Sequence, residues 1–145
     1  IIFEQAQELF ANRPKQNTLS FDVNDFDVSF VRGLSLEDGT TTLTDFTAKI
    51  IGTALLSFLS NVKNTTKVLV CGGGRKNKIL INRVRENTLK SLIIQPIDDY
   101  GVNGDFVESQ AFAFLAIRSL LKLPISFPET TGCTNPSTGG EIIKY

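Results

Sequence analysis

The sequence predicts an α/β fold in which helices cover a β-sheet. An apolar run of strand length at residues 67–71 ends abruptly at consecutive glycines, and a second short apolar run follows at residues 92–94. Apolar residues recur at helical spacing before, between and after these two runs. The resulting order of helix, strand, glycine turn, helix, strand and helix is typical of an α/β unit. Such sheets bind ligands at the carboxyl ends of their strands.

The N-terminal third contains two predicted helices separated by a loop. Residues 2–10 have helical periodicity that stops at Asn12-Arg13-Pro14. Residues 18–30 alternate only weakly, and their aspartates lack the glycine and closing glutamate of an EF-hand, so we interpret them as turn residues rather than calcium ligands. After Asp38-Gly39, apolar residues three and four positions apart predict the longest helix, over residues 42–60.

The central and C-terminal elements follow from the same reasoning. The run at residues 67–71, including Cys71, is apolar enough to predict a buried strand. A helix should follow the glycines, with Leu80, Ile81, Val84 and Leu89 at helical spacing. Asp105 is a reasonable N-cap for a last helix over residues 106–121, which is apolar on every side at residues 111–117 and should be buried nearly all round. Residues 124–140 should form a surface loop.

The bulk composition limits the functions to consider. The chain has 145 residues, and 15 basic residues balance 15 acidic ones, so no overall field favours nucleic acid or an anionic membrane. The uninterrupted apolar stretches are shorter than the roughly 20 residues that cross a bilayer. There is no histidine, and Cys71 and Cys133 are not expected to form a disulfide, so neither His-activated catalysis nor Cys/His zinc binding is expected. Because the chain opens at Ile1 and contains no methionine, we expect it to be part of a longer protein.

Gly72-Gly73-Gly74 is the first candidate binding site, because residues without a Cβ let a ligand or another backbone approach closely. The spacing matches neither the Rossmann fingerprint nor the P-loop. A simple tight turn would explain the glycines equally well. Asn77, at the start of the next helix, could cap that helix or bind a ligand.

The segment from Cys71 to Asn77 closely resembles the Cys-Gly-Gly-Gly-x-x-Asn segment of anhydro-N-acetylmuramic acid kinases. Two further stretches are similar to motifs of these kinases in the same order: Asp38-Gly39-Thr-Thr-Thr-Leu-Thr-Asp-Phe-Thr-Ala48, and Gly104-Asp105-Phe-Val-Glu108-Ser-Gln-Ala-Phe-Ala-Phe-Leu-Ala116. The proline- and glycine-containing tail also resembles theirs. The resemblance covers nearly the whole chain and is weakest before Gly33.

The resemblance implies a ribonuclease-H-like lobe of the actin-like ATPase superfamily, incomplete at its N-terminus. Residues 1–34 would be a lead-in, residues 35–123 the α/β core and residues 124–145 the tail. Gly72, Gly73, Gly74 and Asn77 would bind the nucleotide, and Glu108 would contact a sugar hydroxyl. Asp105 is a weaker substrate-binding candidate, because acidic residues also favour the first turn of a helix through the helix dipole.

The resemblance also implies the activity of the complete protein. In these kinases ATP and Mg²⁺ serve to phosphorylate anhydro-N-acetylmuramic acid while its anhydro ring is opened by water, a step of peptidoglycan recycling in the cytoplasm. The general base and the phosphate loop would lie in a missing N-terminal lobe, so no catalytic residue and no metal ligand is assigned to this chain. We therefore expect the isolated chain to be inactive. A homodimer is implied for the complete enzyme. A noncatalytic actin-like nucleotide-binding or interaction module, or another actin-like sugar or acyl kinase, is the alternative.

Overall fold

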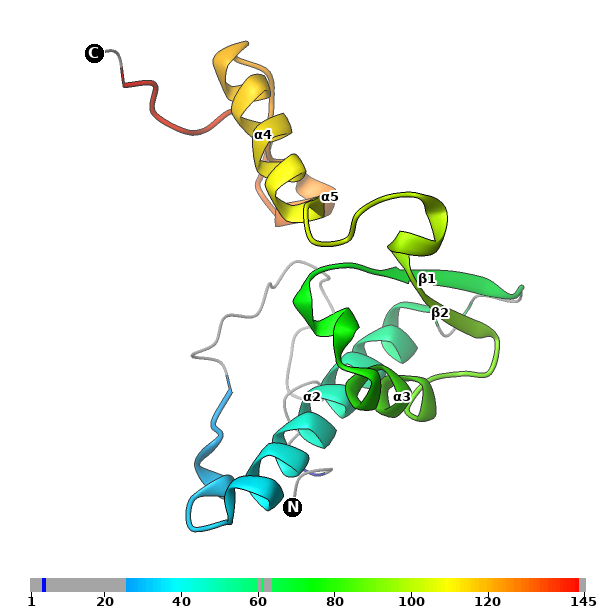
Figure 1. Cartoon of the computed structure of the whole chain (residues 1–145). Coiled ribbons are helices and arrows are strands. Elements are labelled where there is room, and N and C mark those ends of the chain that lie inside the picture. The colour runs from blue at the N-terminus through cyan, green and yellow to red at the C-terminus, as the bar shows by residue number, and fades with distance from the viewer. Residues whose placement is uncertain (1–3, 5–25, 60, 62–63, 144–145) are drawn as a thin grey trace. The chain divides into compact units, whose positions relative to one another are not determined.

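The computed structural model describes residues 4, 26–59, 61 and 64–143 (Figure 1). Its chain forms two compact units, of which the first contains residues 27–105 and the second contains residues 106–143. The predicted helix over residues 2–10, apart from residue 4, and residues 18–25 of the predicted loop lie outside the described residues. At the end of that loop, Ser29 donates backbone and side-chain hydrogen bonds to Asp27, as a turn aspartate does, and a short 3₁₀ helix, η2 (Ser29–Val31), follows.

The longest helix, α2, covers Leu36–Leu59 and thus begins earlier than residue 42, where the sequence placed its start. The reason is an N-terminal cap that the prediction overlooked. The Ser35 hydroxyl accepts a hydrogen bond from the backbone N–H of Asp38 at 3.0 Å and donates one to the Asp38 carboxylate at 2.9 Å. The first of these bonds satisfies one orphan backbone donor at the helix start, so Gly39 lies inside the helix rather than before it.

By length and composition alone, α2 is also sufficiently apolar to cross a membrane. A core helix of a soluble protein passes the same test. In the first unit, α2 contributes Phe46, Ala48 and Gly52 to the interior, and the ring of Phe46 packs edge-on against Phe30 with centroids 5.1 Å apart. These contacts bury part of the apolar surface of α2 within the first unit.

The two predicted strands, β1 (Thr66–Val70) and β2 (Leu92–Pro96), pair in parallel, with Thr66 opposite Leu92 and Val70 opposite Pro96. This confirms the α/β class and the strand–helix–strand order. The prediction of a fully buried strand was wrong, since Leu69 and Ile93 are 43% and 40% exposed. Among the described residues of the first unit, α2 and α3 cover one face of the sheet, and alternate strand residues remain outside the core (Figure 1).

Helix α3 (Lys78–Glu86) connects the strands and packs on α2. The core of the first unit is the buried cluster of Ala48 from α2, Val84 from α3 and Ile94 from β2. Gly52 lets the helices approach so closely that a Cβ there would lie 2.6 Å from the Cβ of Asn87. At the surface, Arg83 forms an ion pair with Asp45 at 3.1 Å, which adds a polar link between the same two helices.

The second unit contains α4 (Val107–Leu120) and the single-turn helix α5 (Pro128–Thr131). The predicted burial of α4 was wrong: none of its residues is buried, and Phe112 and Phe114 are 64% and 58% exposed. Within this unit the following segment contacts the helix, where Arg118 donates to the carbonyl of Pro124 and Ser119 to that of Gly139. Residues 124–140 are largely loop, as predicted, with α5 and an isolated bridge between Ser126 and Ser137 as additions.

Candidate functional site

The glycine turn lies at the carboxyl edge of the parallel sheet. A 3₁₀ helix, η3 (Gly73–Lys76), follows β1, and a second one, η4 (Ile97–Tyr100), follows β2. Because the strands are parallel, these two connections lie at the same edge. The backbone N–H of Gly72 donates to the carbonyl of Gly104 at 2.9 Å, which joins the turn to the segment after η4. This edge is where ligands bind in open α/β sheets.

Gly72 is required by backbone geometry. Its φ of 76° and ψ of 175° lie in a region that is essentially restricted to glycine. A Cβ at this position would meet no atom within 4 Å, so crowding is not the reason for the residue. The tight-turn explanation therefore accounts for Gly72 by itself.

Gly73 and Gly74 have no such requirement. Neither has a positive φ, and both are exposed. A Cβ on Gly73 would have nothing within 4 Å, while one on Gly74 would make an ordinary contact with Leu80 at 3.7 Å. Alanine would fit at both positions within the described part of the chain. Their lack of side chains thus leaves an open stretch of backbone that an external group can approach.

Asn77 caps α3, which was one of its two predicted roles. Its side-chain carbonyl oxygen accepts a hydrogen bond from the backbone N–H of Leu80 at 3.0 Å. That oxygen is therefore committed to the helix. The side-chain NH₂ group keeps two donors, and the residue is exposed next to the turn. Capping and a ligand contact are compatible for this side chain.

Arg75 is the most highly connected polar side chain of the site. Its Nε and Nη2 atoms donate to the two carboxylate oxygens of Asp98 at 2.6 and 2.9 Å. Its Nη1 atom donates to the Gly72 carbonyl at 2.9 Å and to Asp105 at 2.7 Å. The other Asp105 oxygen accepts from Lys76 at 2.7 Å. We call Arg75, Lys76, Asp98 and Asp105 the carboxyl-edge cluster.

The charges of this cluster shift the ionisation of its members. Hydrogen bonds from Arg75 hold the pKa of Asp98 well below its usual range, because they stabilise the charged carboxylate. Hydrogen bonds from Arg75 and then Lys76 lower the pKa of Asp105 to about 2. The bonds to both carboxylates raise the pKa of Arg75. Arg75, Asp98 and Asp105 are consequently charged near neutral pH.

An apolar cavity of about 200 Å³ borders the glycine turn. It lies between α2, the sheet and α3 and is lined at one end by Cys71 and Gly74. Leu55, Val68 and Leu80 contribute to its walls. Cys71 is itself exposed and follows β1, so the prediction that it is a buried strand residue was wrong: the strand ends one residue earlier, where Gly72 turns the backbone. Both cysteines are free thiols.

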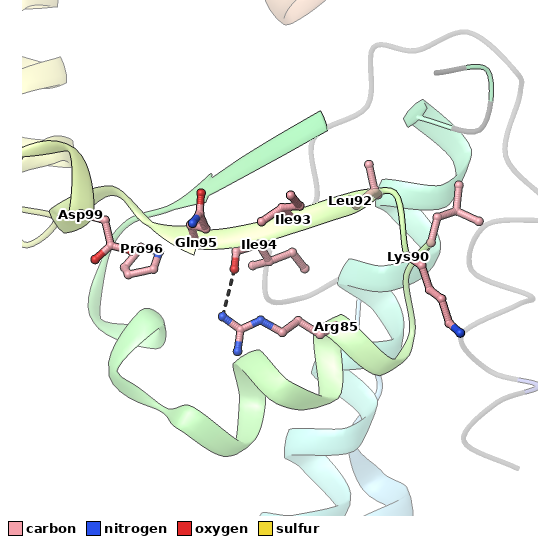
Figure 2. A pocket seen from close by; sticks show the side chains of 9 residues that line it. Arg85, Lys90, Leu92, Ile93, Ile94, Gln95, Pro96 and Asp99 are labelled. Atoms are coloured by element: carbon pink, nitrogen blue, oxygen red, sulfur yellow. Dashed lines mark hydrogen bonds between the residues drawn. The ribbon is translucent and has the colours of Figure 1, made fainter. Parts of the chain in front are cut away.

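A second, more open groove of about 530 Å³ runs along β2 (Figure 2). Arg85 from α3 reaches the strand and donates to the carbonyl of Ile94 at 2.9 Å. Lys90 and Asp99 lie at opposite ends of the groove. None of the site residues predicted from the sequence lines it.

Asp105 and Glu108 differ in their surroundings. Asp105 belongs to the first unit and has both carboxylate oxygens occupied by the carboxyl-edge cluster. It does not cap α4, whose N-cap is Phe106 with no side-chain hydrogen bond, so that prediction was wrong: Arg75 and Lys76 offer stronger, charged donors.

Glu108 belongs to the second unit, in the first turn of α4, and is exposed. Its carboxylate has no hydrogen bond or ion pair to the rest of the described chain.

The sequence analysis missed Arg75 and Asp98. Arg75 occupies a variable position of the glycine motif, and no role was assigned to Asp98 from the sequence. Only the parallel pairing of β1 with β2 reveals that these residues meet. Across the residues that the structure describes, no group of three or more histidine, cysteine, aspartate or glutamate side chains could hold a metal ion.

Comparison with known proteins agrees with these motifs. A family model described as anhydro-N-acetylmuramic acid kinase matches residues 14–145. The chain belongs to this family. A relative of that name from Pelagibacter ubique is 51% identical over 99% of this chain, and one from Zymomonas mobilis is 41% identical over 94% of it. One from Paramagnetospirillum magneticum is 46% identical over 76% of it. The matches cover 39%, 35% and 30% of those three relatives, respectively.

Proposed function

We propose that this chain forms the C-terminal lobe of an ATP-dependent kinase that opens the anhydro ring of anhydro-N-acetylmuramic acid and phosphorylates it. Family membership supports the reaction, and the parallel α/β unit is consistent with an actin-like lobe. The chain spans 39% of the length of the Pelagibacter ubique relative, which leaves room for a second lobe in a protein of that size. The proposal places the product, N-acetylmuramic acid 6-phosphate, in cytoplasmic peptidoglycan recycling.

The observation that carries the nucleotide site is the open backbone at Gly73 and Gly74. Neither conformation nor crowding within the described chain requires glycine at these positions. A planar purine or a ribose that lies against the backbone would require it, because a Cβ would occupy the contact surface. A base that packs against the apolar cavity beside Gly74 would be shielded from water.

The remaining contacts divide between nucleotide and sugar. Asn77 would donate from its free NH₂ group to the nucleotide while its oxygen caps α3. Glu108 would accept a hydrogen bond from a sugar hydroxyl, for which its unoccupied carboxylate is suited. Asp105 remains the weaker substrate candidate, since both of its oxygens already accept charged hydrogen bonds. Its structural role in the carboxyl-edge cluster argues against that use.

The chemistry of the step requires parts beyond these residues. Water attacks the anhydro carbon, and a general base accepts the proton of the water. The bridging oxygen leaves that carbon and takes the γ-phosphoryl group of ATP, whose bond to the β-phosphate breaks to release ADP. Mg²⁺ would neutralise the phosphates and keep several waters, as it does in other kinases. Among the described residues no group of three or more histidine, cysteine, aspartate or glutamate side chains could hold a metal ion, and we propose that the Mg²⁺ ligands and the general base come from the N-terminal lobe. A homodimer of the complete enzyme is part of the same proposal.

A substitution at Gly73 tests the nucleotide site. The assay protein is the complete kinase, or the Pelagibacter ubique relative with its matching segment replaced by this chain. Gly73→Ala should raise the KM for ATP about tenfold or more, because the new methyl group occupies the contact surface, and leave the KM for the sugar unchanged. Gly39→Ala is the matched control: its Cβ also enters open space, but residue 39 lies in α2 and not in the turn.

Three results would contradict the proposal. If Gly73→Ala leaves the KM for ATP unchanged, the nucleotide does not bind at the turn. Phosphorylation of a different sugar or an acyl group, with none of anhydro-N-acetylmuramic acid, would identify another actin-like kinase. Nucleotide binding by the complete protein without any phosphoryl transfer would favour a noncatalytic module. The chain alone serves as a further control and should show no kinase activity, because the catalytic parts of two lobes are needed.

A further inference from the structure

We infer that Arg75 is a positioning residue, which holds the glycine turn in the form that accepts the nucleotide without touching the nucleotide itself. The inference deepens the proposed function and rests on it. Arg75 follows the turn directly, while its main partner Asp98 lies in η4 after the other strand. Their bidentate pair, with distances of 2.6 and 2.9 Å, therefore links the two carboxyl-edge connections of the sheet.

The guanidinium group also controls the backbone of the turn. Its Nη1 atom donates to the carbonyl of Gly72 at 2.9 Å, while the N–H of Gly72 donates to the carbonyl of Gly104. Both polar backbone groups of Gly72 are thus held by hydrogen bonds. Glycine at φ 76° and ψ 175° has many other accessible conformations, so these bonds select one of them. The next residue after Gly72 is Gly73, where the open stretch of backbone begins.

Gly104 completes this arrangement. A Cβ there would lie 2.5 Å from Nε and 2.7 Å from Cζ of Arg75, and 2.9 Å from a carboxylate oxygen of Asp98. The flat guanidinium thus lies directly against the Gly104 backbone, and the N–H of Gly104 points to the Asp98 carboxylate at 3.3 Å. A Cβ at residue 104 would displace this side-chain pair, so the contact rather than a positive φ favours glycine there.

The contacts of Arg75 leave little capacity for a ligand. Four of its N–H groups are already used in bonds to Asp98, Asp105 and Gly72. The side chain is only 6% exposed. Arg75 would therefore affect nucleotide binding through the conformation of the turn. A lysine cannot replace it, because one ammonium group lacks the planar fork that reaches a carboxylate and a carbonyl together.

The test measures ATP affinity in the complete kinase or in the Pelagibacter ubique chimera, by calorimetric titration with a non-hydrolysable ATP analogue. Arg75→Lys should raise the Kd for the analogue about tenfold, and Asp98→Asn should do the same, while the KM for the sugar stays unchanged. The double variant should be no weaker than the worse single variant, since both changes break one linkage. Arg83→Lys is the matched control, because Arg83 forms exposed ion pairs on α3 away from the turn.

The outcomes separate three cases. If Gly73→Ala weakens analogue binding but Arg75→Lys and Asp98→Asn leave the Kd within twofold, the positioning role is refuted and the nucleotide site stands. If the melting temperature falls in both variants with no change in Kd, the cluster is only structural and the inference also fails. If none of the three variants changes the Kd, the nucleotide site and the inference fail together. Should Arg75→Lys not fold, Asp98→Asn and its effect on the Kd decide the question.

Discussion

The contact between α2 and α3 provides a stringent test of the packing in the first unit. In Gly52→Ala the added Cβ would lie 2.6 Å from the Cβ of Asn87, 2.7 Å from its carbonyl oxygen and 3.2 Å from its carbonyl carbon. Two of these atoms belong to the backbone at the end of α3, so a rotamer change cannot relieve the clash. Overpacking of this kind costs about 1 to 3 kcal/mol, and backbone contacts favour the upper end.

The same substitution also has a favourable component. Alanine is better than glycine inside a helix by about 1 kcal/mol, so the net destabilisation should be about 2 kcal/mol. Gly39→Ala in the same helix has the favourable component without the clash, because nothing lies within 4 Å of its Cβ. It should stabilise by up to about 1 kcal/mol. The two variants should therefore differ by about 3 kcal/mol and in sign.

Hydrogen exchange measured on peptides from α2 and α3 of the complete protein reports this difference locally. Gly52→Ala should accelerate exchange in both helices, and Gly39→Ala should leave exchange unchanged or slow it. A pair of variants that shift exchange in the same direction would show that α2 and α3 are not in the contact described here. Equal exchange in Gly52→Ala and the wild type would lead to the same conclusion.

Two further predictions concern the polar groups. Glu108→Gln should raise the KM for the sugar and leave ATP binding nearly unchanged, and unchanged sugar kinetics would exclude the assigned role. The second prediction is a loss of stability in acid. Because Asp105 has its pKa lowered to about 2 and that of Asp98 is also lowered, their contribution is complete above pH about 4 and is lost as the pH falls towards 2. The melting temperature of the wild type should fall more steeply over this range than that of Asp105→Asn, and parallel curves would contradict the role of the cluster.

Local patterns were sufficient to predict the elements of the first unit. The β-branched run before the glycines corresponds to β1, and the next apolar run corresponds to β2. Leu80, Ile81 and Val84, which have helical spacing, lie in α3. Each of these depends on the spacing of a few neighbouring residues, which the sequence contains in full. The start of α2 was missed although its signal was local too. Ser35 and Asp38 form a capping pair, but the prediction placed Asp38-Gly39 before the helix.

Burial was predicted less well than the elements themselves. The apolar composition of β1 and α4 suggested that both were enclosed, whereas Leu69 and the aromatic side chains of α4 are exposed within their own units. Composition shows that a surface prefers an apolar partner, but not whether the same unit supplies one. That depends on which elements lie on each face, which is a property of the assembled fold.

The sequence by itself determined the family, the strand–turn–helix order and the glycine turn, since each depends on residues adjacent in the chain. The tertiary structure showed why each glycine is present. Gly72 adopts a backbone conformation that needs glycine, and Gly104 leaves space for Arg75. Gly73 meets neither of these needs. It also brought Arg75 and Asp98 together across 23 positions of sequence. A pairing of that kind arises only when parallel strands place their carboxyl ends at one edge, so no local pattern could reveal it.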